Sequence, residues 1–283
     1  MQQAEPATPP LFVVALGRSG TTMLMRALAA HPQIIAFSQY PLELRVWTHV
    51  AHRGDASLVS GLLAHEDRLA WPQGVLSRLR SVGHLTARDA MQIYDDLAEE
   101  AGKTSPHLAA EKYPPRLDLQ EALRVVPRAR AVLLVRDPRD VIASARRFDA
   151  KRGYRGFLER DGDGDDVLLE KYGDAYARLA QWRRALGAPL VRYEDLVAEP
   201  DRTLDALFEA LGLDHGAAIV EAARGGWDVK ARRHRTASSA EESVGSWRGA
   251  VSDDFAGRLM DLTGAHLRDL GYGSEVSGEN EAC

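Results

Sequence analysis

Short apolar runs without polar alternation punctuate this chain. The clearest are Leu11–Leu16 and Ala131–Val135, and such runs are typical of strands buried on both faces of a parallel sheet. Weaker runs predict two more strands, one over His107–Lys112 and one, Leu190-Val191, within Ala188–Tyr193. The intervals between these runs are long enough for helices, so we expect the chain to consist of βαβ units.

Helical periodicity fills several of these intervals. In Thr21–Ala30 the apolar residues Met23, Leu24, Ala27 and Leu28 share one face. Further helices are predicted over Asp118–Val125, from the end of Arg136–Asp140 to about Phe148, and over Asp201–Leu211. Residues 44–107 have the pattern of several helices separated by Gly and Pro. Together these elements predict an α/β fold of three layers, with a mostly parallel central sheet flanked by helices.

The sequence predicts a single domain, because it contains no feature that would divide the chain. No internal repeat, low-complexity tract or convincing linker divides it. Residues 1–10 contain three prolines and are expected to form a disordered lead-in. We expect a single domain over residues 11–273 and a flexible tail over residues 274–283.

The composition removes several classes of protein from consideration. The 283 residues are 45% hydrophobic and 27% charged, as in a soluble globular protein, and the net charge of -5 argues against a general nucleic-acid binder. The single cysteine, Cys283, allows no internal disulfide and makes a cysteine nucleophile implausible. The amino terminus lacks a signal-peptide pattern, and Leu11–Leu16 is too short to span a bilayer. We therefore expect a cytoplasmic protein with neither nucleic-acid nor membrane partners.

The segment Gly17-Arg-Ser-Gly-Thr-Thr22 lies between a predicted strand and a predicted helix. Backbone N–H groups at a helix N-terminus point outward, and the helix dipole favours an anion there. Arg18 adds a charge that can bind two oxygen atoms, and Thr21 and Thr22 add hydroxyl donors. The segment therefore indicates an anion site, although by itself it is also compatible with an ordinary tight turn whose hydroxyls cap the helix.

A nucleoside-triphosphate loop of the Gly-x-x-x-x-Gly-Lys-Ser/Thr type is the obvious rival. Gly20 is followed by Thr21 instead of lysine, and Ala15 stands where the first glycine would be. The lysine that reaches the terminal phosphates is therefore missing, and a P-loop-like kinase using ATP and magnesium is only an alternative.

A second motif, Leu134-Val-Arg-Asp-Pro-Arg-Asp-Val-Ile-Ala-Ser144, follows the other clear strand. Arg136 and Ser144 are eight residues apart, about two helical turns, so both can face one pocket if a helix begins soon after Pro138. On its own the motif is equally compatible with a surface ion-pair cluster at a helix start. Two such motifs, in this order and each after a strand, argue against coincidence.

The two motifs together resemble the sulfotransferases that depend on 3′-phosphoadenosine 5′-phosphosulfate (PAPS), especially their bacterial and tyrosylprotein branch. The resemblance implies a P-loop-like α/β fold and an enzyme that moves the sulfuryl group of PAPS to an acceptor hydroxyl, releasing 3′-phosphoadenosine 5′-phosphate (PAP). In this family the first motif binds the 5′-phosphosulfate, and an arginine and a serine of the second grip the 3′-phosphate. The cofactor-binding residues implied here are Arg18, Ser19, Gly20, Thr21, Thr22, Arg136, Ser144 and Tyr193.

The resemblance also implies roles in the reaction. Glu111-Lys112-Tyr-Pro114 is similar to a segment whose lysine approaches the sulfuryl group, so Arg18 and Lys112 are expected to stabilise the leaving group. The tyrosine-modifying relatives use a glutamate as base, and at its distance from the first loop this chain has Gln39. Glu43, the nearest carboxylate, is our candidate base, and Glu111 is the reserve. Either carboxylate could instead be a solvated or ion-paired residue.

Other charged segments do not support a metal. An EF-hand loop starting at Asp161 would need glycine at its sixth position, where Asp166 stands, so Asp161–Asp166 is interpreted as a flexible acidic surface loop. The histidines show no His-Glu-x-x-His spacing. The basic run Lys230–Arg235 is expected either to contact the cofactor phosphates or to be solvated. Ser243-Val-Gly-Ser-Trp-Arg248 resembles a late family loop that closes over the cofactor.

The acceptor is not readable from the sequence: a small-molecule, sugar or peptide hydroxyl is compatible with the family, because the fold does not fix the substrate. Residues 45–106 and 149–170 are the expected carriers of acceptor specificity. A nucleotide-binding protein that has lost catalysis is the remaining alternative, favoured by Gln39. The oligomeric state stays open.

Overall fold

The computed structural model describes residues 7–39, 42–64, 67, 69–157, 159–225, 237 and 239–273. The predicted tail over 274–283 and the basic run Lys230–Arg235 lie outside these residues. The chain forms two compact units. The first unit comprises residues 1–14, 21–132 and 204–227, and the second comprises residues 15–20, 133–203 and 228–283.

A five-stranded sheet of order β2-β3-β1-β4-β5 confirms the predicted mostly parallel sheet. Its strands are β1 (Pro10–Val14), β2 (Ile34–Ala36), β3 (Leu108–Tyr113), β4 (Arg130–Val135) and β5 (Leu190–Arg192). β1 begins one residue inside the segment predicted to be a disordered lead-in, and Pro9 is buried, with its carbonyl accepting from the Ala109 N–H. Pro10 is tolerated in the strand because it is the first residue of it.

Helices occupy the intervals between the strands, and α1 covers the segment predicted for it. They are α1 (Thr21–Ala30), α2 (Val46–Ala51), α3 (Ala56–Leu63), α4 (Val75–Val82), α5 (Ala87–Glu100), α6 (Leu119–Val125), α7 (Pro138–Arg152), α8 (Asp165–Leu186), α9 (Tyr193–Ala198), α10 (Pro200–Ala210), α11 (Ala217–Gly225) and α12 (Asp253–Asp269). None of the helices within the described residues is long and apolar enough to cross a membrane.

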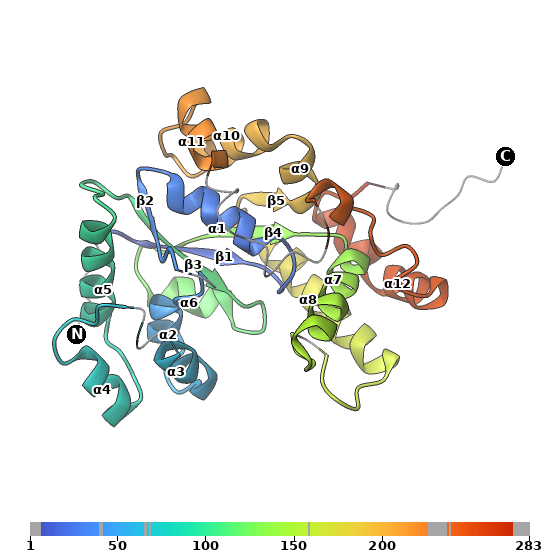
Figure 1. Cartoon of the computed structure of the whole chain (residues 1–283), viewed down its shortest axis with the longest axis horizontal. Helices are drawn as coiled ribbons and strands as arrows, with labels where there is room; N and C mark the ends of the chain where they lie inside the picture. The colour runs from blue at the N-terminus through green and yellow to red at the C-terminus, as the bar shows by residue number, and fades with distance from the viewer. Residues whose placement is uncertain are drawn as a thin grey trace. The chain divides into compact units, whose positions relative to one another are not determined.

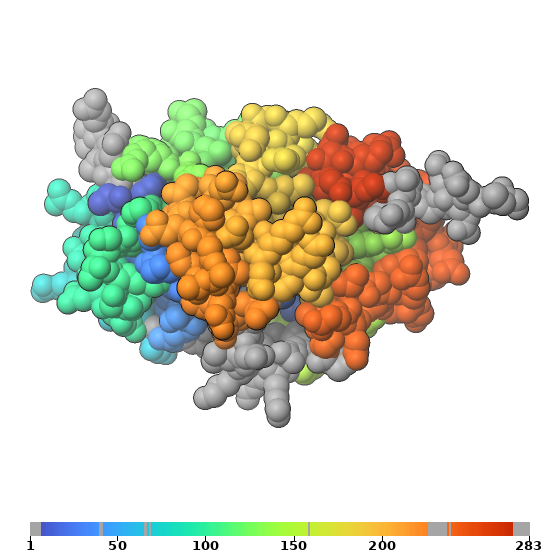
Figure 2. All heavy atoms as spheres, turned by 90° about the horizontal axis from the view of Figure 1, so that it is seen from above, coloured from blue at the N-terminus to red at the C-terminus, as the bar shows by residue number. Residues whose placement is uncertain are grey.

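In the first unit β1 and β3 are buried on both faces. Every residue of β1 and β3 is buried, which requires cover on each side. α1 packs against β2 and β3 and carries α11 on its outer side, while α2 packs against β3 and α6 below the strands in Figure 1. The exposed side chains of α11 form part of the surface in Figure 2, in orange.

The second unit is built around α7, α8 and α12, and α12 packs against both of the others (Figure 1). α7 has defined ends: the Asp137 carboxylate caps the N–H of Arg139, Pro138 occupies the first turn, and Gly153 ends the helix with φ 83°. The helix therefore begins at Pro138, as the spacing of Arg136 and Ser144 required. Arg136 therefore stands just before α7, and Ser144 lies in its second turn.

α8 corrects the interpretation of Asp161–Asp166 as a loop throughout. Asp165 and Asp166 form the first turn of this 22-residue helix, where acidic side chains interact favourably with the helix dipole. The buried face of α8 carries Leu168, Leu169, Tyr172, Ala175 and Tyr176 among others, at helical spacing. α12 contacts α8 at Gly173, whose Cβ position would lie 3.9 Å from Cβ of Leu262.

His49, on α2, makes the stability of the fold depend on pH. Its side chain is fully buried, its Nε2 accepts from the Leu85 N–H at 3.1 Å, and its Nδ1 has no hydrogen-bond partner among the described residues. Burial lowers the pKa of His49 from 6.5 to about 4. Protonation would also break the bond to Leu85, since Nε2 would become a donor.

We expect the free energy of unfolding to fall by about 2–3 kcal/mol between pH 6.5 and pH 4 through this residue. Over this range the unfolded chain binds a proton that the folded chain does not, so acid favours unfolding. Urea denaturation of the wild type and His49→Gln at several pH values measures the difference. The variant loses that part of the slope, whereas His107→Gln, at an exposed histidine, keeps it; equal slopes in wild type and His49→Gln would contradict the assignment.

Candidate functional site

The loop between β1 and α1 contains two residues with left-handed backbone. Arg18 has φ 73° and Gly20 has φ 90°. The turn is closed by the Ser19 N–H, which donates to the carbonyl of Leu16 at 3.3 Å, and Ser19 is buried. Backbone N–H groups in such turns are directed toward one concavity, which is a general way of binding phosphate-like anions. Thr21 and Thr22 follow as the first residues of α1.

An aromatic ring covers each of the two glycines of this loop. A Cβ at Gly17 would lie 2.3 Å from Cδ1 of Phe157, and a Cβ at Gly20 would lie 2.3 Å from Cδ2 of Tyr193. A side chain at Gly20 would meet the buried Tyr193 ring and would adopt a φ that favours glycine, whereas a side chain at Gly17 would have to displace the exposed Phe157 ring. The loop is therefore held between Phe157 and Tyr193.

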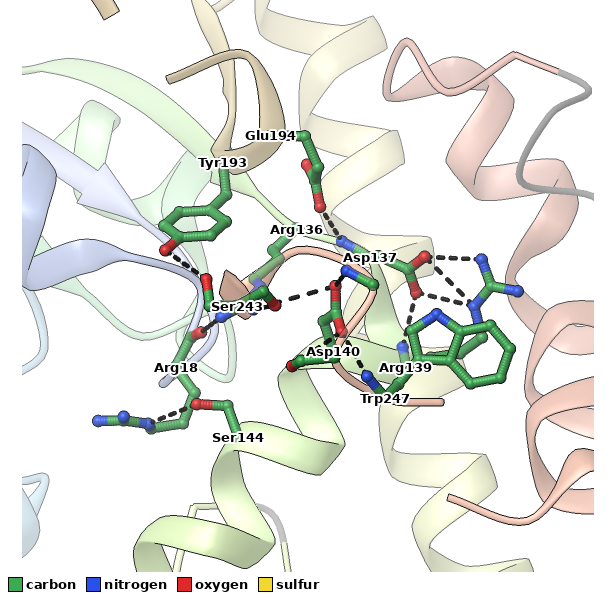
Figure 3. Close-up of polar contacts among 12 residues, drawn as sticks. Arg18, Arg136, Asp137, Arg139, Asp140, Ser144, Tyr193, Glu194, Ser243 and Trp247 are labelled. Atoms are coloured by element: carbon green, nitrogen blue, oxygen red, sulfur yellow. Dashed lines mark hydrogen bonds and ion pairs between the residues drawn. The ribbon is translucent and has the colours of Figure 1, made fainter. Parts of the chain in front are cut away.

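Arg136, which follows β4, joins three segments of the second unit (Figure 3). Its side chain is only 4% exposed. Its guanidinium donates to the carbonyl of Arg18 at 3.1 Å and to the carbonyl of Ser243, and it lies 4.4 Å from the ring centroid of Tyr193. Its Nε is buried and has no hydrogen-bond partner within the described residues. A buried cation with an unused donor is suited to an incoming anion.

Asp140 fixes the late loop 243–247 beside Arg136 (Figure 3). The carboxylate is 1% exposed and accepts from the N–H of Gly245 at 2.7 Å, from the N–H of Trp247 at 2.9 Å and from the Ser246 hydroxyl at 3.3 Å. Burial raises the pKa of this carboxyl, while Arg136, 3.9 Å away, acts in the opposite direction. The carboxylate thus anchors a segment more than 100 residues away in the sequence.

Further polar contacts support this arrangement. The Tyr193 hydroxyl is hydrogen-bonded to the Ser243 hydroxyl at 2.8 Å. Glu194 accepts from the N–H of Asp137 at 2.9 Å, and burial raises the pKa of its carboxyl. Arg139 pairs with Asp137 at 2.7 Å and lies 4.3 Å from the ring of Trp247. The ion-pair cluster considered as an alternative for this motif is therefore present, together with the contacts that join it to the loop.

The structure brings several residues implied by the family resemblance together in the second unit. Ser144 accepts from Nε of Arg18 at 3.3 Å (Figure 3). Arg136 contacts Tyr193 and the backbone of Arg18. Their predicted roles in binding a cofactor stay predictions, because the contacts are among protein groups.

In the first unit, Lys112 lies near the carboxyl end of β3, in register with Val13 of β1. Its ammonium pairs with the Glu43 carboxylate at 3.2 Å, and the other oxygen of Glu43 is 3.5 Å from the Arg45 guanidinium. The Lys112 side chain is 7% exposed and that of Glu43 is 39% exposed. The predicted base and the predicted sulfuryl-side lysine are thus an ion pair, with the carboxylate as its solvent-accessible member.

The burial and hydrogen bonds of Glu111 argue against it as the reserve base. It is fully buried, and its carboxylate accepts from the N–H groups of Trp47 and Thr48, from the Thr48 hydroxyl and from the Tyr94 hydroxyl at 2.6–3.0 Å. Burial raises its pKa and these hydrogen bonds oppose the rise. Two of the donors are N–H groups in the first turn of α2, so Glu111 is a helix-capping residue.

The sequence did not point to the roles of Asp140, Glu194 and Phe157. Asp140 and Glu194 stand inside segments that were recognised, but their partners are distant in the chain. Phe157 carried no signal apart from being an aromatic residue in a polar stretch. No cluster of metal-ligating side chains occurs among the described residues.

Comparisons with known proteins agree with one another. A family model described as "Sulfotransferase family" matches residues 9–216. The omega-hydroxy-beta-dihydromenaquinone-9 sulfotransferase Stf3 of Mycobacterium bovis is 28% identical over 251 residues, which cover 73% of this chain and 63% of that protein. This chain therefore matches less than two thirds of the length of that relative.

Two solved structures share the fold. The sulfotransferase domain from the curacin biosynthetic pathway has a TM-score of 0.59 and 18% identity, covering 96% of this chain and 99% of that one. Mouse sulfotransferase SULT7A1, complexed with PAP, has a TM-score of 0.52 and 14% identity, covering 97% of this chain and 88% of that one. At these identities the likeness concerns the fold alone.

Proposed function

Because this chain belongs to the sulfotransferase family, we propose that it transfers the sulfuryl group of PAPS to an acceptor hydroxyl and releases PAP. The observation that carries the proposal is Arg136. It is a buried guanidinium whose Nε–H has no hydrogen-bond partner in the described part of the chain, and it donates to the carbonyls of Arg18, in the loop after β1, and of Ser243, the last residue of the turn Glu241–Ser243. Such an arrangement favours a ligand with phosphate groups.

The roles proposed for the residues combine the family resemblance with the chemistry of sulfuryl transfer. The reaction joins the acceptor oxygen to sulfur while the bond from sulfur to the phosphate oxygen breaks, and by analogy with phosphoryl transfer catalysis is mostly positioning and charge stabilisation. In the proposal, the turn at Arg18–Gly20 and the first turn of α1 bind the 5′-phosphate. Arg18 and Lys112 stabilise charge on the departing phosphate, and Glu43 takes the acceptor proton.

For the 3′-phosphate we propose Arg136 and Ser144, and we propose Tyr193, whose ring centroid lies 4.4 Å from the Arg136 guanidinium, as a further cofactor-binding residue. A hydroxyl can accept and donate at the same time, so Ser144, which accepts from Arg18 at 3.3 Å, can also donate to a phosphate oxygen. PAP bound to the mouse relative makes PAP the ligand to test first. The acceptor in this proposal is a small-molecule hydroxyl compound.

A thermal-shift titration tests the donor site. PAP is expected to raise the melting temperature, equivalent to about 2.7 kcal/mol at a concentration one hundred times its Kd. Adenosine 5′-phosphate, which lacks the 3′-phosphate, should give a much smaller shift, and ATP with magnesium a smaller one still. A shift with ATP and magnesium alone would favour the kinase alternative. Equal shifts with PAP and adenosine 5′-phosphate would contradict the role of Arg136 and Ser144.

A further inference from the structure

The peptide group between Arg136 and Asp137 is hydrogen-bonded on both of its sides. The Glu194 carboxylate accepts from the N–H of Asp137 at 2.9 Å (Figure 3), and the Tyr176 hydroxyl donates to the carbonyl of Arg136. This N–H and this carbonyl belong to one planar unit, so a rotation of the plane would break both hydrogen bonds. The two contacts therefore fix the backbone from which the Arg136 side chain leaves.

Glu194 is in turn hydrogen-bonded to Tyr272, which follows α12. Oε1 of Glu194 accepts from the N–H of Asp137, and Oε2 accepts from the Tyr272 hydroxyl at 2.8 Å. Tyr272 is only 2% exposed. The Arg192 guanidinium lies 4.4 Å from the centroid of its ring and donates to the carbonyl of Gly271 at 3.0 Å. The two oxygens of Glu194 therefore connect the residue after α12 to the backbone at the start of α7.

The direction of the Arg136 guanidinium matters because this group binds a phosphate through parallel N–H bonds in a fixed plane. Its side chain is long, so a small change in its backbone is magnified at the guanidinium. Displacements of about 1 Å are enough to weaken a site that depends on geometry. Asp137 is the N-cap of α7, so its N–H takes no part in the helix and can be used by Glu194.

We propose that Glu194 and Tyr272 are positioning residues that aim the Arg136 guanidinium at the 3′-phosphate of the donor. Tyr176 holds the other side of the same peptide group. The inference rests on the proposed function, and it concerns recognition of the donor and not the transfer step. Tyr272 then contributes to donor affinity through Glu194, although it lies outside residues 9–216, which match the family model.

Calorimetric titration with PAP and with adenosine 5′-phosphate tests the role of Glu194. Glu194→Leu removes the acceptor for the N–H of Asp137, and we expect the Kd for PAP to rise about tenfold. Adenosine 5′-phosphate lacks the 3′-phosphate, so its Kd should change by less than about twofold. Glu194→Gln keeps an oxygen for that N–H, and its NH2 group can donate to the Tyr272 hydroxyl, so the Kd for PAP should stay within about threefold of the wild type.

Tyr272 provides a second and milder test. Tyr272→Phe keeps the ring beside Arg192 and removes only the hydroxyl. It should raise the Kd for PAP about threefold by itself and add little in the Glu194→Leu background. Thr263→Val is the matched control, because it removes a buried hydroxyl of α12 that donates to the carbonyl of Leu259 at 2.7 Å. It should change the Kd of neither nucleotide.

Hydrogen–deuterium exchange of the ligand-free protein measures the backbone contact directly. The amide of Asp137 should exchange faster in Glu194→Leu than in the wild type or in Glu194→Gln. An unchanged Kd for PAP in Glu194→Leu, or equal losses of affinity for PAP and adenosine 5′-phosphate, would overturn the positioning role. Failure of the wild type to bind PAP, with the difference in exchange preserved, would instead overturn the proposed donor and its 3′-phosphate.

Discussion

Replacing Glu43 with glutamine is expected to lower kcat about 100- to 1,000-fold while the protein keeps its fold and its affinity for PAP. A glutamine of the same shape cannot accept a proton, and general-base catalysis contributes factors of this order. The Glu43 side chain is 39% exposed, and glutamine keeps an oxygen that can accept from the Lys112 ammonium, which is only 7% exposed. The replacement therefore leaves no buried ammonium without an acceptor. The pH–rate profile should also lose the limb that reports the base.

The ion pair between Glu43 and Lys112 allows this experiment to distinguish two roles of the carboxylate. Glu43→Gln keeps a hydrogen-bond acceptor for the ammonium, so a loss of kcat separates proton transfer from the positioning of Lys112. Glu121→Gln is the matched control, because Glu121 is 40% exposed and pairs with Arg124 at 2.7 Å in the same unit. Normal turnover by Glu43→Gln would remove it as the base. Loss of PAP binding would show that the carboxylate acts through structure.

Asp140→Ala is expected to destabilise the protein by about 3–5 kcal/mol and to abolish most PAP binding. Removing this carboxylate leaves Arg136 as a buried charge without its partner, and such losses cost about this amount. The N–H groups of Gly245 and Trp247 also lose their acceptor, so the late loop is released. Urea denaturation with and without PAP measures both effects.

A matched variant separates this effect from simple loss of charge. Asp165→Ala removes a carboxylate that is 58% exposed and pairs with Arg146 at 3.5 Å. It should change stability by no more than about 1 kcal/mol. If Asp140→Ala unfolded at the same urea concentration as Asp165→Ala, the late loop would not depend on this anchor.

The sequence predicted the strands that carry a continuous, buried apolar run. It did not predict β2, whose apolar run is very short, or α8, whose apolar positions are separated by charged residues. β1 and β4 were predictable because a short continuous apolar run between turn residues fits a strand buried on both faces. β2 is only three residues long, and its run is shorter than a sequence pattern needs. α8 carries a helical stripe, but charged residues separate its apolar positions and an acidic turn precedes it.

The same distinction applies to the candidate site. Arg136 and Ser144 could be proposed because they stand in one short motif, and Glu43 and Lys112 because each is close to a recognisable segment. The contacts that define their surroundings could not be predicted, since Ser243 and Gly245 lie more than 100 residues from the groups that hold them. Glu111 shows the converse: a carboxylate beside a candidate lysine looked reactive, but its hydrogen bonds make it structural.

The late loop has a consequence for where this protein can be divided. The family model ends at residue 216, whereas the partners of Arg136 and Asp140 lie at residues 243–247. A fragment ending at 216 would retain both motifs. Arg136 would lose the carbonyl of Ser243, and Asp140 would lose the N–H groups of Gly245 and Trp247. The end of the family match is therefore not the end of the unit that folds together. A shortened or fused version of this protein should keep the residues up to the end of α12 together with the two motifs.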